Sequence, residues 1–583
     1  MLAKIIAGIF RNIAKILEIK DENVFRIRAY EQAAQNIESQ SDDIQDIINK
    51  NRLSIIPGIG PDLSAKIIEI AKTGKLEFFE ELKKTIPEGL LDLLNVPSVG
   101  PKHAKLFYEK LKIQSIPELE KAANQGKLSG LKGIKEKAVE NILKGIALFK
   151  KGRERMDLAA AILACDEFIQ PLKSLPFVQK ITACGSLRRM KETVRDIDIL
   201  AASDSPGKVM DAFVQLPSVR NITVQGTTKS SVITREGVQV DLRVVEEKSY
   251  GAALLYFTGS KNFNIKIRQR AIRKNLKINE YGVFSATKRG GSANNYGGKK
   301  ERFVCGKTEE EIFKCLGLGF IPPELREDRN EVELSLQHKL PLLVSLKDIK
   351  GDLHTHSEYS DGRHSIAEMS KAAMSLGYEY LNISDHSRGL KVARGLSIGE
   401  LKKKKVEIDK LNSKLKNFKL LFGSEVDIDS RGKLDYSDSV LLEFDVTVAA
   451  IHSGFKQSKN QLTKRLVNAC KNKNVDIIAH PSGRLWGSRE PYEIDFEEVF
   501  TAASDYGTAM EINGHALRLD LNDVNSRRAK EKGVRLAIAT DAHAISQLKY
   551  MYLGVAVARR GWLTKDDVIN TLSYEELMRL FKK

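Results

Sequence analysis

Hydrophobic and polar residues follow three patterns along the chain, and each pattern predicts a different kind of element. Residues 1–155 contain apolar helical segments separated by short turns. Between 156 and 250, segments 197–200 and 238–245 alternate polar with apolar residues, which predicts strands with one buried face. Beyond residue 350, short apolar runs that end in polar residues alternate with helical segments such as 365–377. We therefore expect helices first, then a mixed sheet, then repeated strand–helix units.

These changes of pattern divide a chain of 583 residues, which is too long for a single hydrophobic core. The charge-dense stretch after Pro322 and Pro323 is typical of a linker, and the Gly-rich basic stretch 288–300 is typical of a mobile loop. We expect a multidomain α/β protein with two helical units at 1–85 and 86–155, an α/β domain at 156–250, a subdomain at 251–322, a linker at 323–345 and a β/α barrel at 346–583.

The positive charge is concentrated in particular segments. The net charge is +18, and residues 251–300 contain 11 basic residues against one acid, Glu280. A charge meant only for solubility would be spread more evenly, so this distribution indicates a surface that faces a polyanion.

Cysteine usage and hydropathy indicate where the protein acts. The five cysteines are scattered and lack C-x-x-C spacing, which favours a reduced intracellular compartment. Lys4, Arg11 and Lys15 interrupt the apolar N-terminal segment, which we interpret as a packed helix rather than a signal peptide. We expect a monomeric, cytoplasmic and nucleoid-associated protein with no membrane partner.

Three carboxylates lie on the two alternating segments. Asp196 and Asp198 are two positions apart and so project from the same face of a strand, and Asp241 lies on the second strand. On its own D-x-D would favour a solvated strand edge by about three to one, because paired carboxylates are common on exposed strand faces. With the third aspartate and the sequence just upstream, we favour a site for Mg²⁺ or Mn²⁺.

The upstream sequence G-S-L-R-R starts at Gly185. A Gly-Ser turn offers backbone N–H groups and a hydroxyl to phosphate oxygens, and Arg188 and Arg189 add positive charge. We therefore predict that the substrate is a polyphosphate held by metal, with two ions supporting attack by a hydroxyl and departure of pyrophosphate.

Gly-rich turns followed by helices recur in the N-terminal units. I-P-G-I-G-P begins at Ile56, V-P-S-V-G-P begins at Val96, and a weaker copy begins at Leu131. Such turns expose N–H groups at a helix N-terminus and resemble helix-hairpin-helix elements, which grip the DNA backbone without reading sequence. The residues that we expect to contact DNA are Gly58, Gly60, Lys66, Val99 and Gly100.

The first 320 residues or so resemble family X DNA polymerases, the group that includes DNA polymerase beta. The resemblance rests on G-S-L-R-R, D-I-D and V-D-L-R, and continues through Y-F-T-G-S from Tyr256, N-F-N-I-K-I-R and I-N-E-Y-G. It implies a nucleotidyltransferase palm in which Asp196, Asp198 and Asp241 are catalytic. The nucleotide-binding residues are then Gly185, Ser186, Arg189, Tyr256, Phe257, Gly259, Asn264 and Arg268.

The resemblance also implies individual roles. Tyr256 and Phe257 would flank the sugar of the incoming nucleotide, while Asn264 and Arg268 would face the new base pair and the template. Lys66 matches the Schiff-base lysine of family members with lyase activity, but its neighbour Asp62 departs from the pattern, so we favour a DNA-backbone contact.

A second constellation begins at Asp352. Six histidines and three acidic residues lie at or near the ends of successive apolar runs, and the active sites of β/α barrels lie at the C-terminal ends of their strands. Mixed nitrogen and oxygen ligands without cysteine favour Mn²⁺, Zn²⁺ or Fe²⁺ over Mg²⁺, and among these we expect a Mn²⁺ or Zn²⁺ cluster. The predicted ligands are His354, His356, Asp361, His386, Glu425, His452, His480, Asp541 and His543.

Residues 346–583 resemble a PHP (polymerase and histidinol phosphatase) domain. The resemblance implies an active phosphoesterase, associated in fused polymerases with 3′→5′ exonuclease, 3′-end cleaning and abasic-site cleavage. His364, Asp385, Glu511 and His515 are candidates for supporting roles around the ligands.

From these resemblances we expect a DNA-directed DNA polymerase that fills short gaps during repair, with a separate end-processing site. Its partners would be gapped or primer-template DNA and dNTPs. The alternatives are a template-independent nucleotidyltransferase, a small-molecule phosphatase with a DNA-binding arm, and a non-catalytic DNA-binding scaffold. Extension of gapped DNA, or release of phosphate from histidinol phosphate, would distinguish them.

Overall fold

The computed structural model describes residues 2–38, 44–50, 52–87, 89–96, 99–131, 133–286 and 301–581. The predicted loop at 288–300 lies outside these ranges. The chain divides into two compact units. The first comprises residues 1–153 with segments 356–369 and 485–491, and the second comprises residues 154–355, 370–484 and 492–583.

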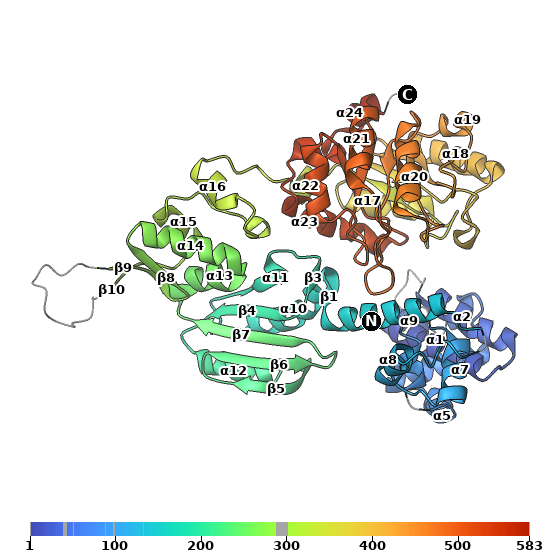
Figure 1. Ribbon diagram of the computed structural model, residues 1–583, viewed down its shortest axis with the longest axis horizontal. Coiled ribbons are helices and arrows are strands. Elements are labelled where there is room, and N and C mark those ends of the chain that lie inside the picture. Colours follow the sequence, from blue (N-terminus) through green and yellow to red (C-terminus); the bar gives the residue numbers. More distant parts are fainter. Residues whose placement is uncertain are drawn as a thin grey trace, which may run out of the picture. The chain divides into compact units, whose positions relative to one another are not determined.

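Residues 1–153 are helical, as their apolar pattern predicts (Figure 1). Phe10 on the first helix packs edge-to-face against Tyr30 on the second, with ring centroids 5.5 Å apart. Helices α4 and α7 both start with proline directly after a glycine N-cap, and this places Gly60 and Gly100 at helix N-termini. The helices are α1 (Leu2–Ile19), α2 (Val24–Glu38), α3 (Ile44–Asn49), α4 (Pro61–Thr73), α5 (Glu77–Lys84), α6 (Leu90–Leu93), α7 (Pro101–Leu111), α8 (Ile116–Asn124) and α9 (Glu136–Glu154).

The second unit begins with a five-stranded sheet in the order β2-β4-β7-β6-β5. Its strands are β2 (Lys180–Ala183), β4 (Ile197–Ala202), β5 (Val219–Gln225), β6 (Lys229–Thr234) and β7 (Gln239–Val245). Helices α10 (Leu158–Lys173) and α12 (Pro206–Val214) pack against the sheet and meet through Phe168 and Phe213. The central strands β4 and β7 are parallel, so matching positions on them lie side by side. A two-stranded pair, β1 (Met156–Asp157) with β3 (Thr193–Val194), lies beside α10.

A subdomain of helices and a small sheet follows. Helices α13 (Tyr250–Thr258), α14 (Lys261–Arg273) and α15 (Glu309–Cys315) share one apolar core that includes Phe263 and Phe313. Strands β8 (Leu276–Asn279), β9 (Gly282–Ala286) and β10 (Glu301–Cys305) form an antiparallel sheet in the order β10-β9-β8.

A buried carboxylate joins this subdomain to α11 (Gly185–Arg188), a short helix that follows β2 in the sequence. Glu309 is 4% exposed and accepts two hydrogen bonds from Arg188, at 2.9 and 2.7 Å. Arg326, which is fully buried, donates to the same carboxylate and lies 5.2 Å from the centroid of the Phe313 ring. Burial alone would raise the pKa of Glu309, but the two guanidinium groups lower it to about 2.

Residues beyond 350 form the predicted barrel. Seven parallel strands lie in sequence order, and a bridge between Thr355 and Ala542 joins the first to the last, so the barrel is nearly closed. The confirmed fold class is therefore multidomain α/β, with seven barrel strands. The strands are β11 (Gly351–Thr355), β12 (Tyr380–Ile383), β13 (Lys419–Asp427), β14 (Val446–Ala450), β15 (Ile477–Ile478), β16 (Ala509–Asn513) and β17 (Leu536–Ala539).

Helices surround the barrel strands in Figure 1 (yellow to red). The stretch 323–345, for which the sequence predicts a linker, contains the short helix α16 (Glu331–Leu336). The barrel helices are α17 (Ile366–Ser375), α18 (Ile398–Asn412), α19 (Asp438–Leu441), α20 (Lys459–Lys471), α21 (Phe496–Tyr506), α22 (Asp523–Glu531), α23 (Met551–Arg560) and α24 (Tyr574–Leu580).

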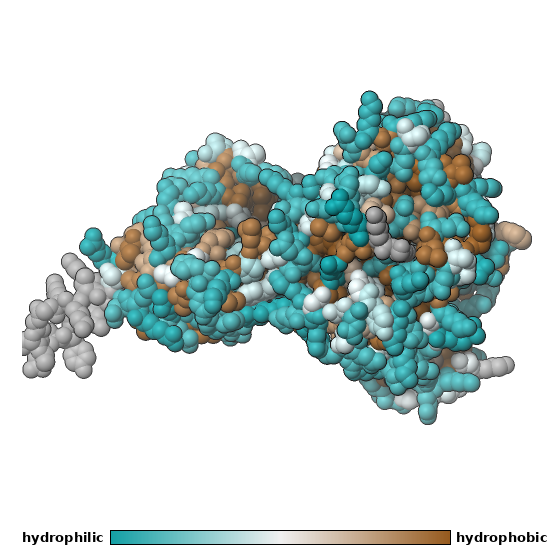
Figure 2. Space-filling view, turned by 90° about the horizontal axis from the view of Figure 1, so that it is seen from above, coloured by the Kyte–Doolittle hydropathy of each residue, from teal (hydrophilic) through white to brown (hydrophobic). Residues whose placement is uncertain are grey.

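Polar side chains cover most of the face visible in Figure 2, with apolar residues in scattered patches. Within the described part of the chain, every helix is too short or too polar to cross a membrane.

The charges around Glu309 predict a pH-dependent stability. A carboxyl whose pKa falls on folding stabilises the folded state above its unfolded pKa of 4.5, and this contribution is lost as pH falls towards 2. The shift corresponds to about 3 kcal/mol at pH 7. We expect Glu309→Gln to destabilise the α13–α15 region by about 3–5 kcal/mol at pH 7, because it leaves buried guanidinium groups uncompensated.

Urea-dependent hydrogen exchange at α15 would measure this difference. The difference in stability of the α13–α15 region between wild type and Glu309→Gln should decrease as the pH is lowered from 5 to 2. Glu310→Gln, an exposed neighbour on the same helix, is the matched control and should change little. A gap that is independent of pH would contradict the argument.

Candidate active sites

The three palm carboxylates gather where β4 and β7 run side by side. Asp198 is the direct partner of Asp241 across the parallel pair, and Asp196 directly precedes β4. Burial, and then the charges of Asp196 and Asp241, raise the pKa of Asp198 to about 6. Like charges held this close are unfavourable unless a cation joins them, and oxygen-only ligands suit Mg²⁺ or Mn²⁺. The donor set therefore fits the predicted metal site.

The Gly-Ser turn lies directly against these carboxylates. Gly185 has a positive φ of 61°, and a Cβ at this position would overlap the Asp198 carboxylate. The N–H of Cys184 donates to the backbone oxygen of Asp198 at 2.7 Å, which fixes the turn to the strand. Only glycine permits this approach without strain.

One cleft contains the predicted nucleotide-binding residues. Asp196 and Asp198 line it together with every residue of that predicted set: Gly185, Ser186, Arg189, Tyr256, Phe257, Gly259, Asn264 and Arg268. The set comes from α11 and from the consecutive helices α13 and α14, and Arg189 and Gly259 directly follow α11 and α13. The cleft thus combines carboxylates, a turn with backbone donors, a guanidinium group and aromatic rings.

The side chains in the cleft are held by specific contacts. The Asn264 amide donates to the backbone oxygen of Tyr256 at 2.7 Å, and Arg268 lies 5.4 Å from the centroid of the Tyr256 ring. Arg243 lies 4.5 Å from the centroid of the Phe257 ring. Of the two consecutive arginines, Arg188 is committed to Glu309, and it is Arg189 that lines the cleft.

Gln239 is the first residue of β7 and lies two positions before Asp241. Its amide donates to Oδ1 of Asp241 at 3.0 Å. It therefore orients the third carboxylate without adding a charge.

The residues that the sequence predicts to contact DNA lie in or near two glycine-containing turns, one before α4 and one before α7. Gly58 has a positive φ of 76°, and Gly60 and Gly100 cap α4 and α7. Lys66 pairs with Asp62 and lies 5.1 Å from the centroid of the Phe78 ring. Val99 is 5% exposed and belongs to the apolar core, whereas Gly100 is half-buried.

A shared carboxylate lies at the centre of the barrel ligands. The two oxygens of Glu425 lie 2.9 Å from His386 Nδ1 and 3.1 Å from His452 Nε2. His480 Nε2 lies 2.9 Å away and His354 Nε2 lies 3.4 Å away. Burial would raise the pKa of Glu425, but the surrounding imidazole groups hold it well below its usual range.

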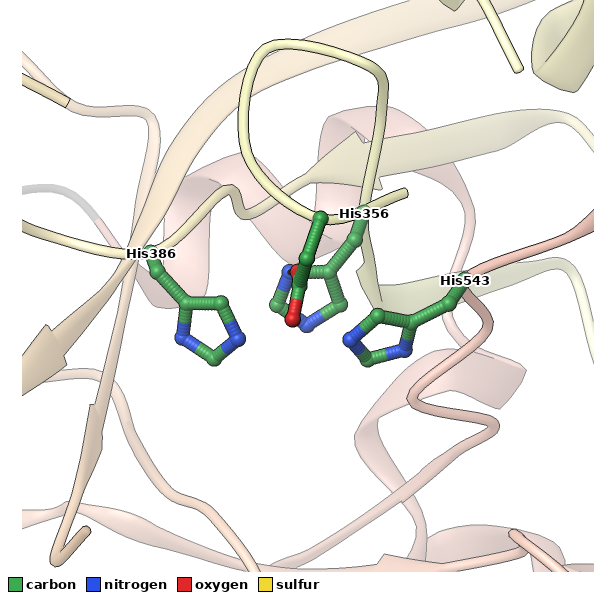
Figure 3. A group of neighbouring side chains, drawn as sticks. His356, His386 and His543 are labelled. Atoms are coloured by element: carbon green, nitrogen blue, oxygen red, sulfur yellow. Dashed lines mark ion pairs between the residues drawn. The ribbon is translucent and has the colours of Figure 1, made fainter. Parts of the chain in front are cut away.

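Among the described residues, eight of the nine predicted ligands, all except His480, form three groups whose ligand atoms lie within 4.8 Å of one another. Figure 3 shows the rings of His356, His386 and His543 turned towards a common centre. Burial and the nearby Arg518 lower the pKa of His480 to about 3, so its imidazole is neutral, the form that binds metals. These nitrogen and oxygen donors fit a transition-metal cluster. The groups are His356, Asp361, His386 and His543; His354, His356 and Asp541; and His386, Glu425 and His452.

Four family models match segments of the chain. They are a helix-hairpin-helix domain at residues 1–76, a SAM-like helix-hairpin-helix tandem at 90–147, a DNA polymerase beta thumb at 253–327 and a PHP domain at 352–515. The DNA polymerase/3′-5′ exonuclease PolX of Bacillus subtilis (strain 168) is 39% identical over 588 residues, which cover 100% of both chains. The chain belongs to family X of the DNA polymerases.

Other relatives match parts of this family X chain. A probable phosphatase of Thermoanaerobacter sp. (strain X514) is 31% identical over 232 residues, which are 38% of this chain and 89% of the phosphatase. DNA polymerase lambda of Rattus norvegicus is 26% identical over 293 residues, which are 47% of this chain and 48% of the relative.

Several residues of this family X chain support the barrel ligands from behind. Glu511 accepts from His354 Nδ1 at 2.7 Å and from the backbone N–H of His480 at 2.6 Å. Asp427 lies 3.2 Å from His452 Nδ1. The sequence indicated Glu511 because it follows an apolar run in M-E-I-N-G, but it gave no signal for Asp427.

Lys404 is a further residue that sequence reasoning missed, because it lies within a run of four lysines. It is fully buried, and its ammonium group lies 2.9 Å from the Asp385 carboxylate. It also donates to the backbone oxygens of Ile383 and Gly423 at 2.8 and 2.9 Å. These contacts fix the strand that precedes His386 and the strand that contains Glu425. His364 and His515 are absent from the three groups formed by described residues.

Glu511 generates a prediction about metal binding. Glu511→Gln keeps the shape of the side chain but replaces an acceptor that orients His354, so metal affinity should fall about 10–100-fold. Metal content after dialysis of the protein against Mn²⁺ at a series of concentrations would measure it. Glu379→Gln, a partly exposed carboxylate paired with Lys350, should bind as wild type does. Equal occupancy in both variants would rule out the orienting role.

Proposed function

We propose that this family X chain is a DNA-directed DNA polymerase that fills short gaps, with a second, metal-dependent site that removes or cleans nucleotides at DNA ends. The observation that carries the proposal is the single cleft in which the predicted nucleotide-binding residues meet Asp196 and Asp198. The full-length similarity to a relative named DNA polymerase/3′-5′ exonuclease supports both activities.

In the palm, Asp196, Asp198 and Asp241 would hold Mg²⁺ or Mn²⁺. Such ions activate an attacking hydroxyl and neutralise a leaving pyrophosphate. The N–H groups and hydroxyl of the Gly185–Ser186 turn would bind the triphosphate, and Arg189 would balance its charge. The nucleotide would then be oriented by the neighbouring rings of Tyr256 and Phe257, whose centroids lie 5.0 Å apart.

In the barrel, the nine predicted residues would hold a Mn²⁺ or Zn²⁺ cluster. Such a cluster supplies a deprotonated water for attack on phosphorus. The protein orients the ligands through Glu511 and Asp427, which accept from His354 and His452. We propose DNA 3′ ends as the substrate and the helix-hairpin-helix turns as backbone contacts that make binding independent of sequence.

A phosphomonoesterase is a second candidate for the barrel. The relative named a probable phosphatase is similar across 89% of its own length, and this favours release of a terminal 3′-phosphate beside or instead of nucleotide removal. We also propose that the protein acts as a monomer in the cytoplasm, on DNA of the nucleoid.

A primer on one-nucleotide-gapped DNA tests the two-site proposal. We expect Asp196→Ala with Asp198→Ala to abolish extension by at least about 1,000-fold while primer shortening stays, because the metal ligands are lost. We expect His354→Ala with His356→Ala to abolish shortening while extension stays. Labelled primer length with Mg²⁺ or Mn²⁺, with and without dNTPs, is the measurement.

Two control variants match these changes. Asp211→Asn is an exposed aspartate on α12, and His338→Ala is an exposed histidine in the linker. Both should retain both activities. Extension by the aspartate variant would overturn the palm assignment, and shortening by the histidine variant would place the nuclease elsewhere. Extension of single-stranded DNA without a template would favour a template-independent transferase.

A further inference from the structure

Arg560 is a residue of the C-terminal barrel that reaches the polymerase cleft. It ends α23, and its side chain is 4% exposed. Nη1 donates to the backbone oxygen of Arg189 at 2.7 Å and lies 3.1 Å from Glu327. Nη2 lies 2.8 Å from Asp523, which belongs to the barrel. The guanidinium group therefore joins the two catalytic halves.

Glu327 completes the connection to the cleft. Its Oε1 accepts from Nε of Arg189 at 3.0 Å, and the same oxygen accepts from Arg560. The Arg189 and Glu327 side chains are 11% and 12% exposed, so water screens the contacts little. Arg189 also donates to the backbone oxygen of Thr258. Both the backbone and the side chain of Arg189 are thus held by charged partners.

The charges around Arg560 determine how much positive charge the cleft presents to a nucleotide. Glu327 paired with Arg189 alone would cancel the positive charge that the cleft presents. Arg560 shares Glu327 and pairs with Asp523, which in turn pairs with Arg329 at 3.1 Å. The five side chains carry three positive and two negative charges, and the remaining positive charge is available to an anion in the cleft.

We propose that Arg560 is a positioning residue for the nucleotide triphosphate, so that the barrel helps to build the polymerase site. Arg560 acts through Arg189 and Glu327 and does not touch the nucleotide itself. The inference rests on the proposed polymerase activity, and it adds that removing a side chain of the nuclease half weakens dNTP binding.

Arg559 provides a matched control. It is the preceding residue on α23, and it lies 2.7 Å from Glu324 and donates to the backbone oxygen of Val344 at 3.0 Å. It therefore also joins the barrel to the preceding segment through an ion pair and a backbone contact. Within the part of the chain that the structure describes, these contacts of Arg559 do not involve Arg189 or Glu327.

The experiment is steady-state gap filling at varied dNTP concentration. We expect Arg560→Ala to raise KM for dNTP about 10-fold with kcat changed less than about 3-fold, since it removes a contact that orients a binding group. Primer shortening without dNTP should remain at the wild-type rate. Arg559→Ala should leave KM unchanged. Arg560→Lys retains the charge without the planar fork and should give an intermediate KM.

A double variant, Arg560→Ala with Glu327→Gln, tests whether Arg560 acts on Arg189 through Glu327. If Arg560 acts through Glu327, the double variant should raise KM less than the product of the two single effects. An unchanged KM in Arg560→Ala, or an equal rise in Arg559→Ala, would overturn the proposal. Should Arg560→Ala fail to fold, the KM of Arg560→Lys decides in the same way. Absence of gap filling by wild type would refute the polymerase proposal instead, and that result is distinct from each of these.

Discussion

The polymerase half depends on the sharing of Glu309 between Arg188 and Arg326. The carboxylate comes from α15, while the two arginines come from α11 and from the segment that follows the small sheet. Such a buried group is tolerated only because two guanidinium groups surround it. Arg188 is committed to this contact, and the next residue, Arg189, lines the cleft. The charge balance of the interior therefore decides which of two consecutive arginines faces a substrate.

Glu425 follows the same rule in the barrel, with imidazole groups in place of guanidinium groups. Four histidine nitrogens lie within 3.4 Å of its two oxygens. Each site thus concentrates charges that would be unfavourable alone, and each is stabilised from behind by groups that do not touch a substrate. Glu511, Asp427 and Lys404 do this in the barrel, and Glu327 does it beside the palm. Such supporting groups keep a site in one geometry.

The sequence predicted what local periodicity determines. Alternation placed the palm aspartates on one face, and polar residues at strand ends indicated a barrel with its ligands at one rim; the fold class and the family are confirmed. The residue roles and the domain boundaries stay predictions. Local sequence patterns did not show which distant residues would contact each other. Arg560 and Arg189 are 371 positions apart, and in the sequence Lys404 looks like any other solvated lysine among four consecutive lysines. Only three-dimensional packing distinguishes such residues from their neighbours.

The bridge between Thr355 and Ala542 has a consequence for synthesis of the protein. It joins the first barrel strand to the end of the last, and predicted metal ligands lie beside both partners at His354, Asp541 and His543. Domains fold as units while the chain emerges from the ribosome, N-terminal parts first. The barrel cannot close before residue 542 has emerged, so its predicted metal centre lacks Asp541 and His543 until the last of the seven strands has been made. A chain that ends before Asp541 therefore cannot assemble the proposed end-processing centre.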